Sequence, residues 1–241
     1  MDGDLTLLGF GPEGWGLVLL RAAGTTVAVS ASAFALGAVL GCLCAWARLS
    51  GPAPVRWLAQ GYTTILRGVP DLLVIYLFYF GGRQALALAS SLLGGPAGLD
   101  FNGFLAGMLA IGLISGAGQS EVMRGAYLAL SRGELEAARV VGMGRWLMLR
   151  RIVVPQGLRL ALPGLGNQWQ SAVKESALVS VTGLVETLRQ VSIAANSTEL
   201  PLFFFLVGGA IYLLITSLSG LLLRGAEAWS MRGQPAIGTR G

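Results

Sequence analysis

Apolar runs long enough to cross a lipid bilayer constrain this chain more than any other feature of its sequence. The run from Leu17 to Trp46 contains a single charged residue, Arg21. A helix needs about 20 apolar residues to cross a hydrocarbon core of about 30 Å. Only 12% of the 241 residues are charged, which is about half the share in a typical soluble domain. We therefore predict an all-α, polytopic membrane protein with room for about five crossings.

The apolar runs divide into predicted spans that are joined by polar or glycine-rich segments. These spans are Leu17–Trp46, Leu58–Phe80, Asn102–Leu130, Leu162–Leu184 and Pro201–Leu223. Pro70 is expected to bend or break the second span, because proline cannot donate the hydrogen bond of a helix interior. We expect segment 81–101 to lie outside, with a surface helix as one possible form. The polar segment 185–199 is also expected outside.

Small residues within the spans predict close helix packing. Gly37 and Gly41 form a GxxxG step in the first span, a pattern that lets helix backbones approach each other in lipid. The third span has small-residue faces made by Ala106, Ala110, Gly112 and Gly116. Cys42 and Cys44 are two residues apart, so they do not face each other on a helix. We expect both to be packed, reduced thiols.

The cations predict the orientation of the chain. Segments 81–101 and 185–199 carry only Arg83 and Arg189. The segments expected on the other side of the membrane carry Arg48, Arg56, Arg132, Arg139, Arg145, Arg150, Arg151, Arg159, Arg224, Arg232 and Arg240. Because Lys and Arg are enriched in cytoplasmic loops, we expect the N-terminus outside and the C-terminus in the cytoplasm. Residues 1–16 then form an external segment, 17–228 the transmembrane domain and 229–241 a cytoplasmic tail.

The stretch from Ser131 to Pro155 is the longest charged segment between apolar ones. Ser131 and Glu134 have the spacing of a capping box, in which each side chain satisfies a free backbone N–H at a helix start. Ala137, Ala138 and Gly142 leave one face of this helix nearly bare. A bare face lets the backbone of another protein approach closely, so we interpret the stretch as a cytoplasmic docking helix. The alternative from spacing alone is an amphipathic helix that covers the inner surface.

The spacing of this stretch resembles the EAA loop of permease subunits in ATP-binding-cassette importers. The matching positions are Glu136, Ala137, Ala138, Gly142, Ile152 and Pro155. Gly61–Gly81 and Ala161–Leu184 are also similar to permeases of the polar amino acid uptake family, especially those that serve histidine, arginine and opines. The likeness covers nearly the whole chain after residue 15.

The resemblance implies the transmembrane half of a type I importer, with a cytoplasmic coupling loop at about residues 131–158. It also implies the partners: a second permease subunit, homologous and forming a heterodimer, two ATPase subunits, and a periplasmic amino-acid-binding protein. The location it implies is the bacterial inner membrane. The implied substrate is a polar amino acid or opine, and ATP hydrolysis is expected on a partner chain.

Charges within the spans are candidates for the substrate pathway. A charge at mid-bilayer costs about 2.5 to 3.5 kcal/mol on insertion scales, so these side chains should face a cavity or a partner. Asp71 and Glu121 are the candidates for holding a cationic amino acid. The structural alternatives pair Asp71 with Arg67, and Glu121 with Arg124. For Lys174 and Glu175 we favour structural roles.

Several absences narrow the function. The chain has no histidine and no GxxxxGK[ST] phosphate-binding loop, so imidazole chemistry and a P-loop ATP site are excluded. We expect no catalytic residue, cofactor or metal, and no nucleic-acid partner. The rival function is a self-contained ion-coupled carrier or channel, in which Asp71 and Glu121 would bind the ion.

Overall fold

The computed structural model describes residues 7–11, 14–85, 88 and 102–230, and these residues form a bundle of long helices without a strand. Of the predicted segment 81–101, residues 81–85 are helical, whereas residues 86, 87 and 89–101 lie outside the described residues, as does the predicted tail 229–241 from residue 231 on. The elements are α2 (Gly16–Ser50), α3 (Ala53–Gly68), α4 (Asp71–Tyr76), the π-helix η1 (Leu77–Gly81), α6 (Gly103–Leu128), α7 (Arg132–Val140), α8 (Arg145–Met148), the π-helix η2 (Leu149–Val153), α9 (Val154–Glu175), the 3₁₀-helix η3 (Ser176–Thr182), α10 (Thr187–Thr198) and α11 (Pro201–Ser230).

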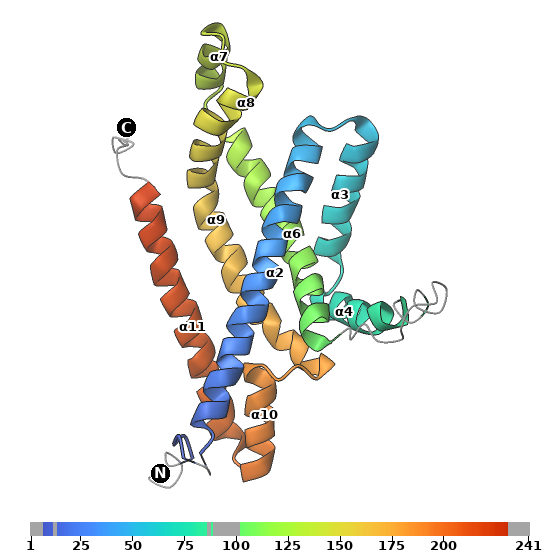
Figure 1. Cartoon of the computed structure of the whole chain (residues 1–241), viewed down its shortest axis with the longest axis vertical. Coiled ribbons are helices and arrows are strands. Elements are labelled where there is room, and N and C mark those ends of the chain that lie inside the picture. The colour runs from blue at the N-terminus through green and yellow to red at the C-terminus, as the bar shows by residue number, and fades with distance from the viewer. Residues whose placement is uncertain (1–6, 12–13, 86–87, 89–101, 231–241) are drawn as a thin grey trace.

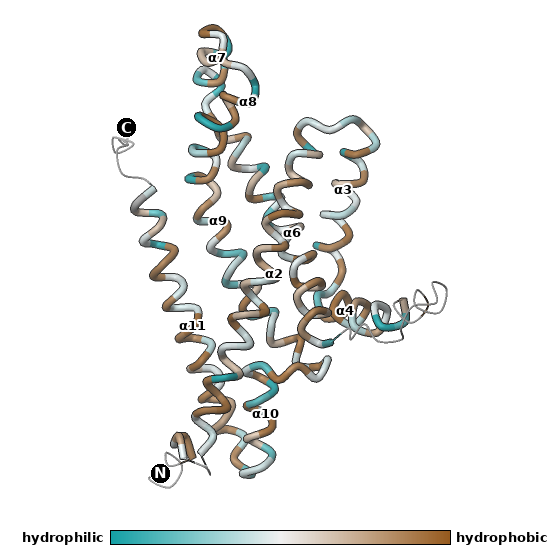
Figure 2. Tube along the Cα trace, viewed as in Figure 1, coloured by the Kyte–Doolittle hydropathy of each residue, from teal (hydrophilic) through white to brown (hydrophobic). Residues whose placement is uncertain are grey.

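Three of the described helices are long and apolar enough to cross a membrane: α2, α6 and residues 201–228 of α11. Helix α3 with residues 71–85 makes a fourth if that bent pair counts as one span. Figure 1 shows these helices side by side, with α9 running among them. In Figure 2 the apolar colour follows much of α11, whereas polar residues gather in α7 and α10. The first, third and fifth predicted spans are thus confirmed as apolar helices.

The second predicted span is broken, as Pro70 led us to expect. Val69 has an extended backbone, the conformation that a following proline favours. The chain turns by 109° between α3 and the helix that starts at Asp71. This turn also separates Arg67 from Asp71, so they do not share a helix face. The predicted alternative of an Arg67–Asp71 pair is wrong, because Arg67 instead lies 3.8 Å from the carboxylate of Glu121.

The fourth predicted span differs from the observed helix at both ends. Helix α9 begins at Val154, and it continues α8 and η2 without a break in helical backbone. The second half of the predicted coupling loop, 131–158, is therefore helical. At the other end the α-helix gives way at Ser176 to the tighter η3. Four side-chain amides and three charged residues make α9 less apolar than α2, α6 and α11, and it is not among the helices that are apolar enough to cross a membrane.

Helices α2 and α6 pack closely at the predicted small residues. A Cβ on Gly37 would lie 3.1 Å from backbone atoms of both Gly112 and Gly116, and one on Gly41 would lie 3.2 Å from the Gly116 oxygen. These separations are tighter than an ordinary Cβ contact, so a side chain at either position would have to push the two helices apart. Between the two glycines of α2, the buried Gln119 amide donates to the backbone oxygen of Phe34. The pair α2–α6 is therefore the centre of the bundle.

The two cysteines have different environments. Cys44 is buried and its thiol donates to the backbone oxygen of Ala59, whereas Cys42 is exposed beside the sulfur of Met123. Both are free. The expectation that both are packed is therefore correct for Cys44 and wrong for Cys42, because Cys42 lies on the face of α2 that borders a groove.

Segment 185–199 is more ordered than a polar connection. It contains α10, whose N-terminus is capped by Glu186. The carboxylate accepts hydrogen bonds from the backbone N–H groups of Leu188 and Arg189 and from the hydroxyl of Tyr212 in α11. The hydroxyl of Thr26 in α2 also donates to it. Glu186 is fully buried, so it fastens α2, α10 and α11 together.

Candidate functional site

Helix α7, which carries the predicted docking residues, stands at one end of the bundle (Figure 1). The ends of α2 and α11 that carry Arg48 and Arg224 point the same way, whereas α10 lies at the opposite end. Glu136 and Ala137 are exposed and Ala138 is buried. Ile152 is half-buried in η2, and the exposed Pro155 follows as the second residue of α9.

The N-terminus of α7 does not form the predicted capping box. Ser131 occupies the N-cap position, but its side chain makes no capping hydrogen bond. Glu134 instead accepts a hydrogen bond from the side-chain amide of Gln156 in α9. The contact spans the turn between α7 and α8, so it ties the exposed helix to the base of α9.

The backbone conformation of Gly142 explains why a glycine ends α7, whereas the sequence suggested that its small size served to leave one helix face bare. Its φ of +78° is left-handed, and a Cβ added there would meet nothing within 4 Å. The N–H of Gly142 donates to the carbonyl of Arg139, and the N–H of Met143 donates to the carbonyl of Ala138. This pair of bonds is the Schellman motif, which favours glycine at that position. Gly142 therefore fixes the direction in which the chain leaves α7.

The π-helical turn η2 lies directly before Pro155. Proline has no N–H to donate to the carbonyl four residues earlier, here that of Arg151, and its ring crowds that carbonyl. A wider turn before the proline relieves the crowding and keeps the helix continuous. Residues 145–175 therefore form one helical rod that begins beside α7.

The end of α7 and the turn after it expose large apolar side chains that sequence reasoning missed. Val140 is 87% exposed, Val141 72% and Trp146 74%. The sequence did contain a clue to them, because these apolar residues stand among charged ones in a stretch that is predicted to lie outside the membrane. We call Val140, Val141 and Trp146 the apolar tip. Together with the exposed Glu136, it gives this end of the bundle a surface suited to contact with another protein.

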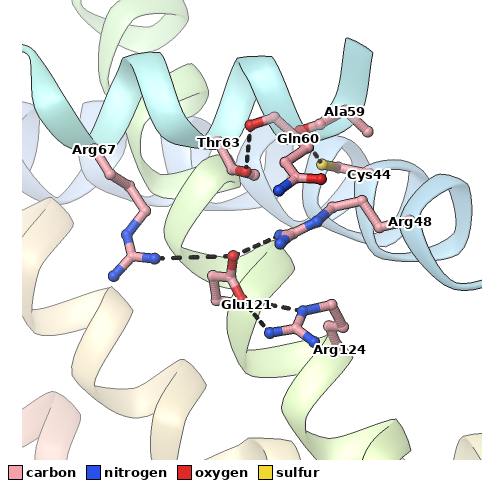
Figure 3. Close-up of polar contacts among 8 residues, drawn as sticks. All are labelled: Cys44, Arg48, Ala59, Gln60, Thr63, Arg67, Glu121 and Arg124. Atoms are coloured by element: carbon pink, nitrogen blue, oxygen red, sulfur yellow. Dashed lines mark hydrogen bonds and ion pairs between the residues drawn. The ribbon is translucent and has the colours of Figure 1, made fainter. Parts of the chain in front are cut away.

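A second polar site gathers around Glu121, where α2, α3 and α6 meet (Figure 3). The guanidinium of Arg48 contacts one carboxylate oxygen, Arg67 lies 3.8 Å from the same oxygen, and Arg124 lies 3.0 Å from the other. The predicted contact between Glu121 and Arg124 is present. The contribution of Arg48 and Arg67 was not predicted, because their partner is distant in the sequence.

A third site brings together two acidic side chains. Asp71 opens α4, and Glu175 closes α9. Both are half-buried and their carboxylates interact electrostatically. One oxygen of Glu175 is buried and has no hydrogen-bond partner among the described residues. Lys174, the neighbouring cation, is exposed.

No group of three or more cysteine, aspartate or glutamate side chains that suits a metal ion occurs in the part of the chain that the structure describes. The three sites are therefore an exposed docking helix, an arginine–glutamate cluster and a pair of half-buried acids that interact electrostatically.

Residues 37–228 match the model of the family described as binding-protein-dependent transport system inner membrane component. The chain belongs to this family. Members of this family are components of transporters, not enzymes. The inner membrane location that the resemblance implied agrees with the description of the family.

Several curated relatives of the family are similar over nearly their whole length. The octopine transport system permease protein OccQ of Rhizobium meliloti is 54% identical over 231 residues, which cover 96% of this chain and 98% of the relative. The nopaline transport system permease protein NocQ of Agrobacterium fabrum is 45% identical, with 95% and 98% covered. The histidine/lysine/arginine/ornithine permease HisQ of Escherichia coli is 37% identical, with 87% and 92% covered.

Two solved transporter structures share the fold of this chain. A crystal structure of an amino acid ABC transporter with histidines has a TM-score of 0.76 and 28% identity, covering 89% of this chain and 95% of that chain. An inward-facing MetNI methionine ABC transporter matches with a TM-score of 0.68 at 15% identity. The all-α permease fold predicted from the sequence is thus confirmed.

Proposed function

We propose that this chain is the permease subunit of an ATP-binding-cassette importer that carries opines or other polar, basic amino acids across the bacterial inner membrane. The observation that carries the proposal is the exposed α7, with Glu136 and the apolar tip, at the end of a membrane bundle of this family. The 54% identity to the octopine permease favours an opine. The proposed transmembrane domain is 17–228, with 1–16 in the periplasm and 229–241 in the cytoplasm.

The geometry of α7 suits the transmission of force from an ATPase. The Glu134–Gln156 hydrogen bond and the left-handed Gly142 fix α7 against the start of α9. Since residues 145–175 are one continuous helical rod, a displacement of α7 passes along α9 toward Glu175. ATP hydrolysis on two partner ATPase subunits would thereby drive alternating access at the other end of the rod.

The remaining partners follow from the surfaces that the single chain leaves open. Helix α11 exposes large apolar side chains, among them Leu206, Leu213 and Leu222. Such a surface suits lipid or a second permease subunit. We propose a homologous permease as that second subunit and a periplasmic binding protein as the donor of the substrate.

Asp71 and Glu175 are the proposed contacts for the cationic part of the substrate. The carboxylates of Asp71 and Glu175 interact electrostatically, and a cation bound between them would remove their mutual repulsion. A guanidinium or ammonium group also supplies donors to the Glu175 oxygen that lacks a partner. Glu121, the other candidate from the sequence, already meets three arginines. We propose Glu121 as a latch between α2, α3 and α6.

The test is uptake of labelled octopine and labelled arginine into proteoliposomes that contain the complete importer. Uptake should require ATP, and Glu136→Arg should abolish it by preventing the ATPase from docking. Asp71→Asn and Glu175→Gln should raise the half-saturating substrate concentration at least about tenfold, because each removes a charged hydrogen-bond partner. Asp71→Glu, which keeps the charge, is the matched control.

Two results would contradict the proposal. Unchanged half-saturation in both Asp71→Asn and Glu175→Gln would remove the acids from the substrate site. Uptake without any ATPase, which collapses with an ion gradient, would favour the rival ion-coupled carrier.

A further inference from the structure

A groove lies beside α7, between the end of α2, the end of α6 and the first part of α9. Its volume is about 990 Å³, which is at the upper end for pockets that hold a small organic molecule. Most of its lining is aliphatic, aromatic or thioether, including Trp46, Met123 and Leu158. Neither the substrate contacts nor the latch proposed above uses this groove.

The polarity of the groove changes along its length. Arg139 of α7 and Arg145 of α8 line one end of the groove. From there the lining on α9 runs from Val154 to Leu165 without a charged residue. At 1.5 Å per residue this is roughly 16 Å of helix, close to half of a hydrocarbon core of about 30 Å. The apolar part of the groove therefore matches the depth of one leaflet.

The two arginines lack anionic partners within the described residues. Neither Arg139 nor Arg145 forms an ion pair there, and no acidic side chain lines the groove. Both side chains are exposed. Two unpaired guanidinium groups above an apolar channel complement a ligand that has an anionic head and a hydrocarbon tail. A protein helix in the groove would have to bring its own acids to the same place.

We propose that the groove binds one anionic phospholipid of the inner leaflet. Arg139 and Arg145 hold its phosphate, and one acyl chain lies between α2 and α9 beside Trp46. The proposal rests on the proposed function in one respect, because it takes the α7 end as cytoplasmic. Basic pockets between helices on that side are suited to anionic headgroups. The lipid would join α7 and the base of α9 to the end of α2 from the membrane side.

Gly157 offers a way to fill the groove without a clash. It lines the groove, and a Cβ added there would meet nothing within 4 Å. Gly157→Leu should therefore occupy the space of the acyl chain. Gly125→Leu is the matched control, since Gly125 is equally open but does not line the groove.

The experiment measures the fluorescence of Trp46 in the complete importer, in bilayers of phosphatidylcholine that contain a small fraction of brominated phosphatidylglycerol. Subtracting the quenching of a Trp46→Phe variant isolates Trp46. Brominated phosphatidylglycerol should quench at a concentration on the order of tenfold lower than brominated phosphatidylcholine. Arg139→Gln with Arg145→Gln should remove that preference, and Gly157→Leu should abolish the quenching at low lipid fractions.

The charge control is Arg150→Gln with Arg151→Gln, which removes the same charge at the same end but outside the groove. It should retain the preference. Equal quenching by the two lipids, or a preference that survives Arg139→Gln with Arg145→Gln, would overturn the proposal. Absence of quenching in the complete importer would show that protein covers the groove, which would also overturn it. If ATP-driven uptake persists in that case, the proposed function stands and only the lipid site falls.

Discussion

Gly142 ends α7 in a backbone conformation that few residues other than glycine adopt without strain. The sequence suggested a small residue for close contact with a partner, whereas the structure places open space around its missing Cβ. The left-handed φ of +78° explains the residue type by itself. An interpretation based on residue size was therefore incomplete, because φ cannot be read from a list of small residues.

Gly142→Ala should destabilise the turn after α7 by about 1 kcal/mol, the cost of placing a Cβ in the left-handed region. Gly142→Asn should cost less, since asparagine tolerates that region. Hydrogen exchange of the α7 amides measures the effect. Gly144→Ala is the control, because Gly144 has a φ of −63° that any residue adopts. Equal exchange in Gly142→Ala and Gly144→Ala would contradict the explanation.

Glu186 joins three helices through a single buried carboxylate. It lies between η3 and α10, outside the helices that cross the membrane. Burial raises the pKa of its carboxyl above the ordinary 4.5, although hydrogen bonds from Leu188, Arg189, Tyr212 and Thr26 act in the opposite direction. Sequence reasoning did not single it out, because it reads as one more charge in a polar segment.

The folded protein holds the Glu186 proton more tightly than the unfolded chain does. The carboxyl therefore contributes stability below pH 4.5, and this contribution is lost as the pH rises through the raised pKa. In Glu186→Gln the pH dependence should disappear. The measurement is the thermal midpoint of each protein against pH, taken as the difference between wild type and variant. Glu199→Gln, at an exposed glutamate after α10, should leave the curve unchanged, and parallel curves for Glu186→Gln would contradict the prediction.

At the scale of elements, α7 and the rod of residues 145–175 act as one unit. The sequence predicted a helix in the right place but assigned 145–158 to the coupling loop. The structure extends the helix because the π-turn η2 accommodates Pro155. A flexible loop would absorb a displacement of α7, whereas a continuous helix passes that displacement on to α9.

The apolar tip should dominate the contact between α7 and its partner ATPase. Val140→Asp or Trp146→Asp should weaken docking at least about tenfold, because exposed aromatic and aliphatic anchors carry much of the energy of an interface. Binding of purified ATPase to the detergent-solubilised permease measures it. Val55→Asp, at an exposed valine in the first turn of α3, is the control. Docking that is unchanged by both tip variants would show that the ATPase binds elsewhere.

At the scale of the whole molecule, the helix ends divide the chain into two poles. Helix α7 and the arginine-bearing ends of α2 and α11 share one pole, and α10 lies at the other (Figure 1). This division agrees with the distribution of arginines in the sequence. Because of this division, labelling one residue at each pole tests the orientation of the chain in the membrane.

In a background of Cys42→Ser and Cys44→Ala, a thiol introduced by Glu136→Cys should react with a membrane-impermeant maleimide only from the cytoplasm. A thiol introduced by Asn196→Cys, at an exposed position of α10, should react only from outside. Right-side-out and inverted membrane vesicles separate the two cases. Labelling of Glu136→Cys from outside would invert the orientation and remove α7 from any cytoplasmic ATPase.

The sequence by itself determined the first, third and fifth apolar spans, the break at Pro70, the close approach at Gly37 and Gly41, and the spacing of the docking stretch. These features depend on local terms, such as the transfer of side chains to lipid and the limits on proline and glycine, that act wherever the residues occur. Only the tertiary structure decided that Glu121 meets three arginines and that Asp71 lies close enough to Glu175 to interact with it electrostatically.

The tertiary structure likewise decided that Glu186 joins three helices. Thr26 and Glu186 are 160 residues apart and yet share a hydrogen bond. Such contacts follow from the angles at which helices pack and turn, just as the position of Asp71 follows from the 109° bend after α3. The sequence pattern of a single helix cannot predict those angles, because each angle depends on all the surfaces that are buried together in the bundle.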